Sequence, residues 1–117
     1  MEFREVLPSM PVLQLESSIA FYSKVGFQLV NRFGDDMAIV QRGKHEVCLW
    51  TCLDPSVPLN HHFFVVVHDV HEVRLEFEKA GIATLRGPRK AADGVLMLEV
   101  PDPSGHALRF ISRTKRM

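Results

Sequence analysis

FYSKVGFQLV (Phe21 to Val30) and FEKAGIATL (Phe77 to Leu85) decide the fold, because they are two copies of one pattern in a single chain. In each copy, a helix-like segment with an aromatic residue is followed by a glycine and then by a run typical of a β-strand. Gly26 and Gly81 stand where a helix C-terminal glycine belongs, and they are 55 residues apart. A repeat of this length predicts two supersecondary units, neither of which can close a hydrophobic core alone.

The first copy is predicted to contain a strand, a helix and three further strands. An apolar strand over Val6 to Leu15 precedes a helix opened by Glu16, Ser17 and Ser18, with Ser17 as the N-cap. Turn residues then separate three runs of strand-forming residues. Those strands are expected over residues 27–33, 37–41 and 45–52, and a proline-rich linker over 54–58.

The second copy repeats this order. A buried strand over 62–68 precedes a helix in which Asp69 and Glu72 form a pair similar to a capping box. A weak strand is expected over 82–86, a polar loop over 87–94, and two strands over 95–100 and 107–112 around a Asp-Pro-Ser-Gly turn. Both halves therefore read β-α-β-β-β, which predicts an α+β fold.

Length and composition set the domain organisation. The chain has 117 residues, the size of a single domain. Its parts are expected to be a first module over about 5–53, a linker over 54–60, a second module over about 61–112 and a basic tail over 113–117. Lysine plus arginine equals aspartate plus glutamate, at 14 each, which argues against a nucleic-acid binder and suggests a partner subunit.

Apolar runs and cysteines indicate the compartment. The longest apolar run, Phe63 to Val67, is far shorter than the ~20 residues that span a bilayer. No signal-like apolar segment opens the sequence, so we expect a soluble cytoplasmic protein without a membrane partner. Cys48 and Cys52 lie on one predicted strand, with Cα atoms about 13 Å apart. A disulfide needs less than ~7 Å, so free thiols are expected.

Three stretches resemble the vicinal-oxygen-chelate superfamily of glyoxalases, bleomycin-resistance proteins and extradiol dioxygenases. Residues 11–50, from PVLQLESSIAFYSKVGF to HEVCLW, resemble its first module. HHFFVVVHDVHEVRLEFEKAGI (61–82) and VPDPSGHALRF (100–110) resemble its second module. The resemblance implies two βαβββ modules whose eight strands form an open cup, paired across a homodimer, with sites near the subunit interface.

Metalloenzymes of this superfamily place four metal ligands inside the cup, and the resemblance assigns those positions here. They map to Leu7, Glu46, His62 (or His61, if the register differs by one residue) and Arg109. Leucine offers no lone pair and arginine is permanently cationic, so two of the four positions cannot bind a metal. Other donors that remain are His45, Cys48 and His106.

Strand alternation predicts which side chains line the cup, because residues i, i+2 and i+4 share one face. Trp50 either stacks on a planar ligand or packs as a partly exposed aromatic residue, and Phe33 is a second stacking wall or hairpin packing. Arg109 either binds a ligand carboxylate or phosphate, or pairs with Glu46. The residues expected to line the cavity are Leu7, Ser9, Glu46, Cys48, Trp50, His62, Phe64 and Arg109.

The leading hypothesis is a small-molecule binding protein that uses no metal and resembles the bleomycin-resistance branch. It would sequester an aromatic or heteroaromatic ligand against Trp50, with Arg109 and Glu46 setting the polarity. The alternative is a glyoxalase-like lyase, isomerase or dioxygenase that uses a divalent metal such as Zn, Ni, Mn or Fe, with His62 and Glu46 as ligands. A third hypothesis is a catalytically inactive interaction module.

Overall fold

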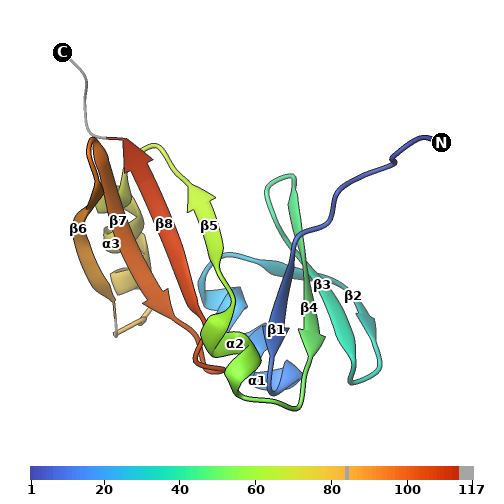
Figure 1. The fold of residues 1–117 in the computed structure, drawn as a ribbon. Helices are drawn as coiled ribbons and strands as arrows, with labels where there is room; N and C mark the ends of the chain where they lie inside the picture. The colour runs from blue at the N-terminus through green and yellow to red at the C-terminus, as the bar shows by residue number, and fades with distance from the viewer. Residues whose placement is uncertain (84, 114–117) are drawn as a thin grey trace.

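The computed structural model describes residues 1–83 and 85–113. Its elements occur as βαβββ twice, with one extra short helix between the two repeats (Figure 1). The elements of the first module are β1 (Ser9–Val12), α1 (Leu15–Lys24), β2 (Gln28–Phe33), β3 (Met37–Arg42) and β4 (His45–Thr51). The short helix α2 (Ser56–Asn60) leads to β5 (Phe63–Val66), α3 (Val70–Lys79), β6 (Arg86–Ala92), β7 (Val95–Pro101) and β8 (Ala107–Arg113).

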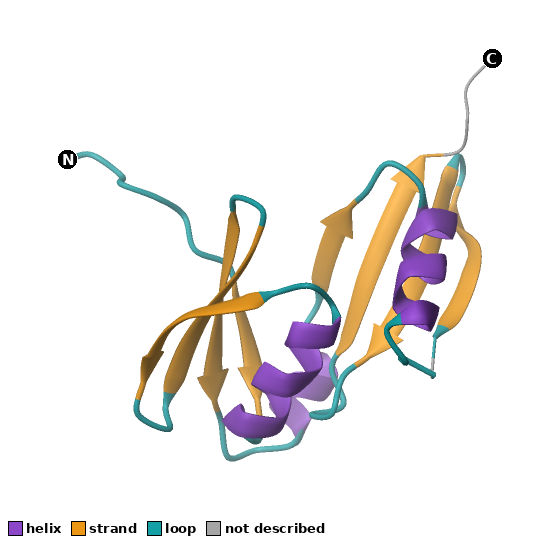
Figure 2. Ribbon diagram, turned by 180° about the vertical axis from the view of Figure 1, so that it is seen from behind, coloured by secondary structure: helices purple, strands orange, loops and turns teal. Residues whose placement is uncertain are grey.

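The strands form two open four-stranded sheets, ordered β1-β4-β3-β2 and β5-β8-β7-β6. In each sheet, one pair of neighbouring strands is parallel, β1 with β4 and β5 with β8. The other neighbouring strands are antiparallel. Helix α1 covers one face of the first sheet and α3 covers the corresponding face of the second (Figure 2). The α+β class and the two βαβββ modules are thus confirmed.

Glycines end both long helices, as the repeat predicted. Gly26 has φ 98°, and beyond it the Phe27 N–H donates to the Tyr22 carbonyl over 2.9 Å. Gly81 has φ 85°, and the Ile82 N–H donates to the Phe77 carbonyl over 3.0 Å. These hydrogen bonds, each from an N–H to the carbonyl five residues earlier, satisfy helix carbonyls that would otherwise lack partners. They require a residue that tolerates positive φ just before the donor.

The helix starts follow the sequence prediction only in the second module. Asp69 is the N-cap of α3, and its carboxylate accepts from the His71 N–H over 2.9 Å. The prediction of Ser17 as the N-cap of α1 is wrong, since the helix starts at Leu15 and Gln14 precedes it without a side-chain cap. Burial of Leu15 against the core favours the earlier start, and the Ser17 hydroxyl donates to the Gln14 carbonyl instead.

Two segments predicted to be irregular are regular. The linker contains α2, and the polar loop expected over 87–94 is largely β6 (Arg86–Ala92). The strand predicted over 82–86 is wrong for the described residues of that range, because only Arg86 belongs to a strand. Thr84 and residues 114–117 of the predicted tail lie outside the described residues. β6 is an edge strand with two register shifts, so it lacks the alternating apolar pattern of a buried strand.

Each module has its own packed layer, and a few polar contacts join the two. Apolar residues from α1 and the first sheet are fully buried, as are those from α3 and the second sheet. Between modules, the Tyr22 hydroxyl donates to the Asp102 carboxylate over 2.6 Å, and the Leu13 N–H donates to the Ser104 hydroxyl over 2.9 Å. Among the described residues, no helix is long and apolar enough to cross a membrane.

Candidate functional site

An apolar row of side chains crosses the uncovered face of the first sheet. The strand register places Trp50 beside Pro11 on one side and Met37 on the other, and places Phe33 beside Met37. We call these four residues the aromatic row. Phe33 is 50% exposed and Met37 is 37% exposed, so the row presents apolar surface to solvent in a single chain. Trp50 and Phe33 therefore share one face, as two walls for a planar ligand require.

The side chains next to the aromatic row on this face are smaller and more polar than those of the row itself. Cys48 lies between Ser9 and Ile39, and Glu46 lies opposite Gln41 at the end of β4. Burial raises the pKa of the Cys48 thiol, which keeps it protonated near neutral pH. Cys48 and Cys52 are both free thiols, and Cys48 acts here as a small apolar side chain that widens the space beside Trp50.

A second row of side chains crosses the uncovered face of the second sheet, and it contains charged residues. Register places Phe64, Arg109, Glu99 and Arg86 side by side on four strands, and we call them the arginine row. The Arg109 Nε lies 3.4 Å from the Glu99 Oε2, and the Nη2 of Arg89 lies 3.0 Å from the Glu99 Oε1. Sequence reasoning missed Glu99, whose side chain is nearly buried. Strand alternation gives the face on which Glu99 lies, but its pairing with Arg109 depends on the register between β7 and β8.

The expected Arg109–Glu46 ion pair is wrong. Glu46 belongs to the first sheet, whereas Glu99 lies directly opposite Arg109 on the adjacent strand of the second. His62 does lie near Arg109, with the His62 Nδ1 3.4 Å from the Arg109 Nη1, and the guanidinium stands 6.0 Å from the Phe64 ring centre. The structure therefore brings His62, Phe64 and Arg109 together and leaves Glu46 apart.

The donor set does not fit the metal site of the superfamily. Leu7 precedes β1 in an extended N-terminal segment, and Arg109 is bound to Glu99. His61 contacts another histidine instead, with its Nδ1 3.0 Å from the His106 Nε2. In the described part of the chain, no three histidine, cysteine, aspartate or glutamate side chains cluster as metal ligands would.

His106 follows Gly105 and closes a turn, and its ring is fully buried. Its N–H donates to the Asp102 carboxylate over 3.0 Å, and its carbonyl accepts from the Asp102 N–H over 2.8 Å. Burial lowers the pKa of His106 to about 4, helped by His61, Arg109 and His62 nearby. Burial also raises the pKa of Asp102, against the hydrogen bond from Tyr22. This network joins the modules.

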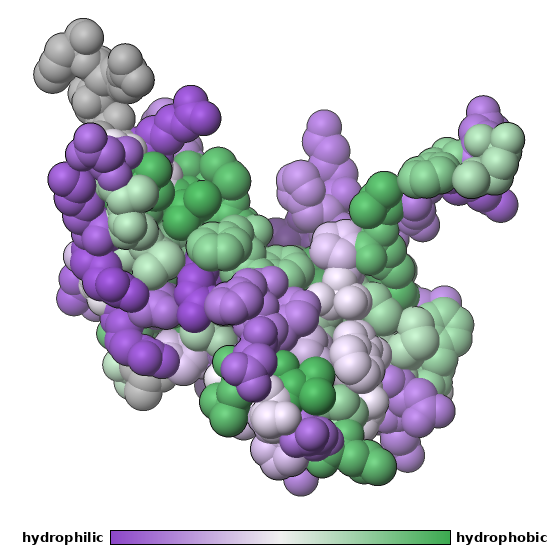
Figure 3. All heavy atoms as spheres, in the orientation of Figure 1, coloured by the Kyte–Doolittle hydropathy of each residue, from purple (hydrophilic) through white to green (hydrophobic). Residues whose placement is uncertain are grey.

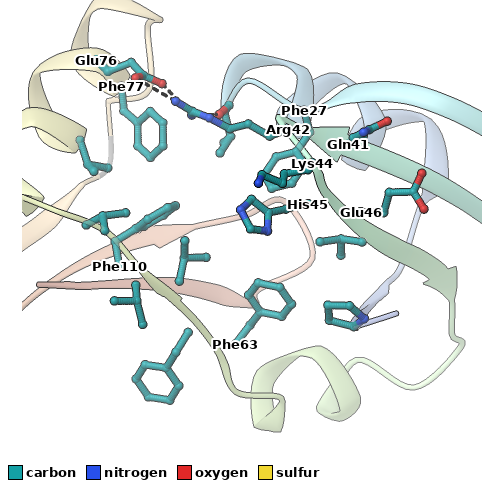
Figure 4. Close-up of a pocket in the computed structure, with 18 of the residues that line it drawn as sticks. Phe27, Gln41, Arg42, Lys44, His45, Glu46, Phe63, Glu76, Phe77 and Phe110 are labelled. Atoms are coloured by element: carbon teal, nitrogen blue, oxygen red, sulfur yellow. Dashed lines mark hydrogen bonds and ion pairs between the residues drawn. The ribbon is translucent and has the colours of Figure 1, made fainter. Parts of the chain in front are cut away.

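A groove of about 1120 Å³ lies between the two modules. Figure 4 shows its apolar wall of Phe63, Phe77 and Phe110, with Arg42, Lys44 and His45 on the opposite side. The ion pair between the Arg42 Nη1 and the Glu76 Oε2, at 2.8 Å, joins the modules at one end. Of the eight residues predicted to line the cup, together with Phe33, only Glu46 and Phe64 line this groove. The groove thus shares Phe64 with the arginine row and no residue with the aromatic row.

Comparison with known proteins gives concordant matches. The family model of the glyoxalase/bleomycin resistance protein/dioxygenase superfamily matches residues 7–110. An uncharacterised protein of Mycolicibacterium smegmatis is 32% identical over 102 residues, covering 87% of each chain. The structure of a bleomycin-binding protein complexed with bleomycin is similar with a TM-score of 0.78 at 25% identity, over 95% of this chain and 99% of that one. The bleomycin resistance determinant encoded on transposon Tn5 gives a TM-score of 0.75 at 25% identity, over 95% and 98%.

Proposed function

Because the chain belongs to the glyoxalase/bleomycin resistance protein/dioxygenase superfamily, we propose that it binds and sequesters a planar aromatic small molecule without using a metal. The observation that carries the proposal is the aromatic row. Exposed aromatic and thioether side chains in one line supply stacking surface, and soluble proteins seldom leave such surface open without a use. The two bleomycin-binding structures at 25% identity support the same class of function.

The donor chemistry supports a mechanism that needs no metal. A leucine and an arginine stand at two of the four ligand positions of the superfamily, and the arginine is bound to Glu99. A bound cation beside Arg109 would meet like-charge repulsion. The chemistry of this site is therefore recognition by stacking and hydrogen bonding rather than polarisation of a substrate.

The binding cleft is proposed to form between two copies of the chain. The radius of gyration is 14.8 Å, larger than the roughly 13 Å of a compact chain of this length. Residues 1–8 precede β1 without regular secondary structure, and Phe3 and Val6 are 73% and 80% exposed. Figure 3 shows the hollow between the modules into which a second copy would pack. In such a dimer, the aromatic row of one subunit would face the arginine row of its partner.

Ligand binding is tested with 1-naphthamide, 1-naphthoate and bleomycin as probes, by isothermal titration calorimetry. Phe33→Ala is expected to weaken binding of the naphthalene probes about fivefold or more, because it removes one stacking wall. Leu29→Ala is the matched control: Leu29 lies on the same strand and is 48% exposed, but it registers with Val40 on the helix-covered face. If none of the probes binds, or if both variants bind equally, the proposal is overturned.

The absence of a metal requirement is tested by elemental analysis. Protein dialysed against Mn²⁺, Fe²⁺, Co²⁺, Ni²⁺ and Zn²⁺ and then against buffer is expected to retain far less than one metal per chain. About one equivalent per chain that is lost in His62→Ala would contradict this part of the proposal and favour a metalloenzyme. Sedimentation equilibrium of the same samples tests the dimer.

A further inference from the structure

The arginine row and its surroundings carry an excess of positive charge that the overall neutrality of the chain conceals. On the uncovered face of the second sheet, the register places four arginines and one carboxylate, and two of these arginines contact that carboxylate. These residues are Arg86, Arg89, Arg109, Arg113 and Glu99. Among the described strand residues on this face, Glu99 is the only acidic side chain. One carboxylate cannot neutralise four guanidinium groups, so the face is cationic.

Glu99 fixes two of these guanidinium groups instead of neutralising them all. Its two carboxylate oxygens are each used by a different arginine, Oε1 by Arg89 and Oε2 by Arg109. The Glu99 side chain is 11% exposed, whereas the Arg89 side chain is 58% exposed. The carboxylate therefore holds the two arginines from the buried side. Two guanidinium groups repel each other unless an anion lies between them. Glu99 therefore preorganises neighbouring donors that face outward.

Arg109 keeps donor capacity for a ligand. A guanidinium has five N–H groups. Within the described chain, Arg109 makes polar contacts only through its Nε to Glu99 and through its Nη1 to His62. Phe64 lies beneath its guanidinium, at 6.0 Å from the ring centre, which restricts the plane of the group. The arrangement suits a planar anion that can accept two parallel hydrogen bonds.

From this geometry we infer that the ligand of the proposed cleft is an aromatic carboxylate, whose ring stacks on the aromatic row and whose anionic group binds Arg109 and Arg89. The inference rests on the proposed function, since the two rows meet only in a cleft between subunits. It adds the charge of the ligand, which the aromatic row alone does not specify. A cationic aromatic compound would meet uncompensated repulsion at the same place.

The test compares three probes of one size and different charge: 1-naphthoate, 1-naphthamide and 1-naphthylmethylamine. Calorimetric titration at low salt is expected to show 1-naphthoate binding about tenfold more tightly than 1-naphthamide, equivalent to about 1.4 kcal/mol, with the amine weakest. Arg89→Gln and Arg109→Gln are each expected to remove most of the preference for the carboxylate while leaving 1-naphthamide binding within about twofold.

Lys24→Gln is the matched control, because it removes one positive charge from the last turn of α1, on the other side of the first sheet. It should leave the preference for the carboxylate unchanged. Unchanged 1-naphthamide binding also verifies that each arginine variant is folded. Equal binding of the acid and the amide, or tighter binding of the amine, overturns the inference and leaves the proposed function standing. Failure of all three probes to bind overturns the inference, and failure of bleomycin as well overturns the proposed function.

Discussion

The buried His106 makes the stability of this protein depend on pH in a way that can be calculated from its surroundings. Its ring is fully buried, and its Nε2 lies 3.0 Å from the His61 Nδ1. Burial, with His61, Arg109 and His62 nearby, lowers the pKa of His106 to about 4. In the unfolded chain the pKa returns to about 6.5. Between these values the unfolded state binds a proton that the folded state does not.

The sign and magnitude follow from proton linkage. A lowered folded-state pKa contributes stability that is fully present above pH 6.5 and is lost as the pH falls towards 4. Between pH 6.5 and 5 the loss is about 1.5 pKa units at 1.36 kcal/mol each, or about 2 kcal/mol. This is a large part of the 5–15 kcal/mol that stabilises a typical domain. Stopping at pH 5 limits the opposing contribution of Asp102, whose pKa is raised chiefly by burial.

The assay is urea unfolding followed by Trp50 fluorescence, at fixed protein concentration, at intervals from pH 7.5 to 5. The expected result is that the wild-type protein loses about 2 kcal/mol more over this interval than His106→Asn. His106→Asn is less stable at all pH values because it leaves a cavity, so the slope is the quantity compared. His68→Asn, at an exposed position after β5, should keep the wild-type slope. Equal slopes for the wild type and His106→Asn would refute the reasoning.

Two further substitutions test what joins the modules and what ends α1. Tyr22→Phe removes the buried 2.6 Å hydrogen bond to the Asp102 carboxylate, so urea unfolding at pH 7 should show a loss of about 1.5–3 kcal/mol; an unchanged midpoint would show that this bond contributes nothing. Gly26→Ala is expected to cost about 1–2 kcal/mol, because a residue with a Cβ is strained at φ 98°, and more than Gly34→Ala, since φ 58° lies at the left-handed minimum. Equal losses for the two alanine variants would contradict this reasoning.

Periodicity and turn residues predicted most of the fold. The two cap glycines, the aspartate N-cap of α3 and seven of the eight strands are local signals, because each depends on residues within a few positions. The segments that sequence missed, α2 and β6, are short or lie at a sheet edge, where local preference is weak. Their structure depends on neighbours that are distant in sequence.

For the candidate site, the sequence predicted which side chains share a face of a sheet, but it did not predict which side chains pair with each other. Strand alternation correctly placed Trp50 with Cys48 on one face and Arg109 with Phe64 on another. It could not identify Glu99 as the partner of Arg109, because alternation gives the side of a sheet and not the register between strands. The resemblance, and not strand alternation, assigned Leu7 to a position inside the cup, and the structure places that residue before β1 begins at Ser9.

The sequence by itself determined the repeat, the α+β class and the family, because these depend on the order of helices, strands and glycines along the chain. Only the tertiary structure decided that two four-stranded sheets stay separate, that Arg89 and Arg109 share the carboxylate of Glu99, and that His106 is buried beside Asp102. The physical reason is that burial and charge pairing depend on strand register and on contacts between modules, which join residues far apart in the sequence.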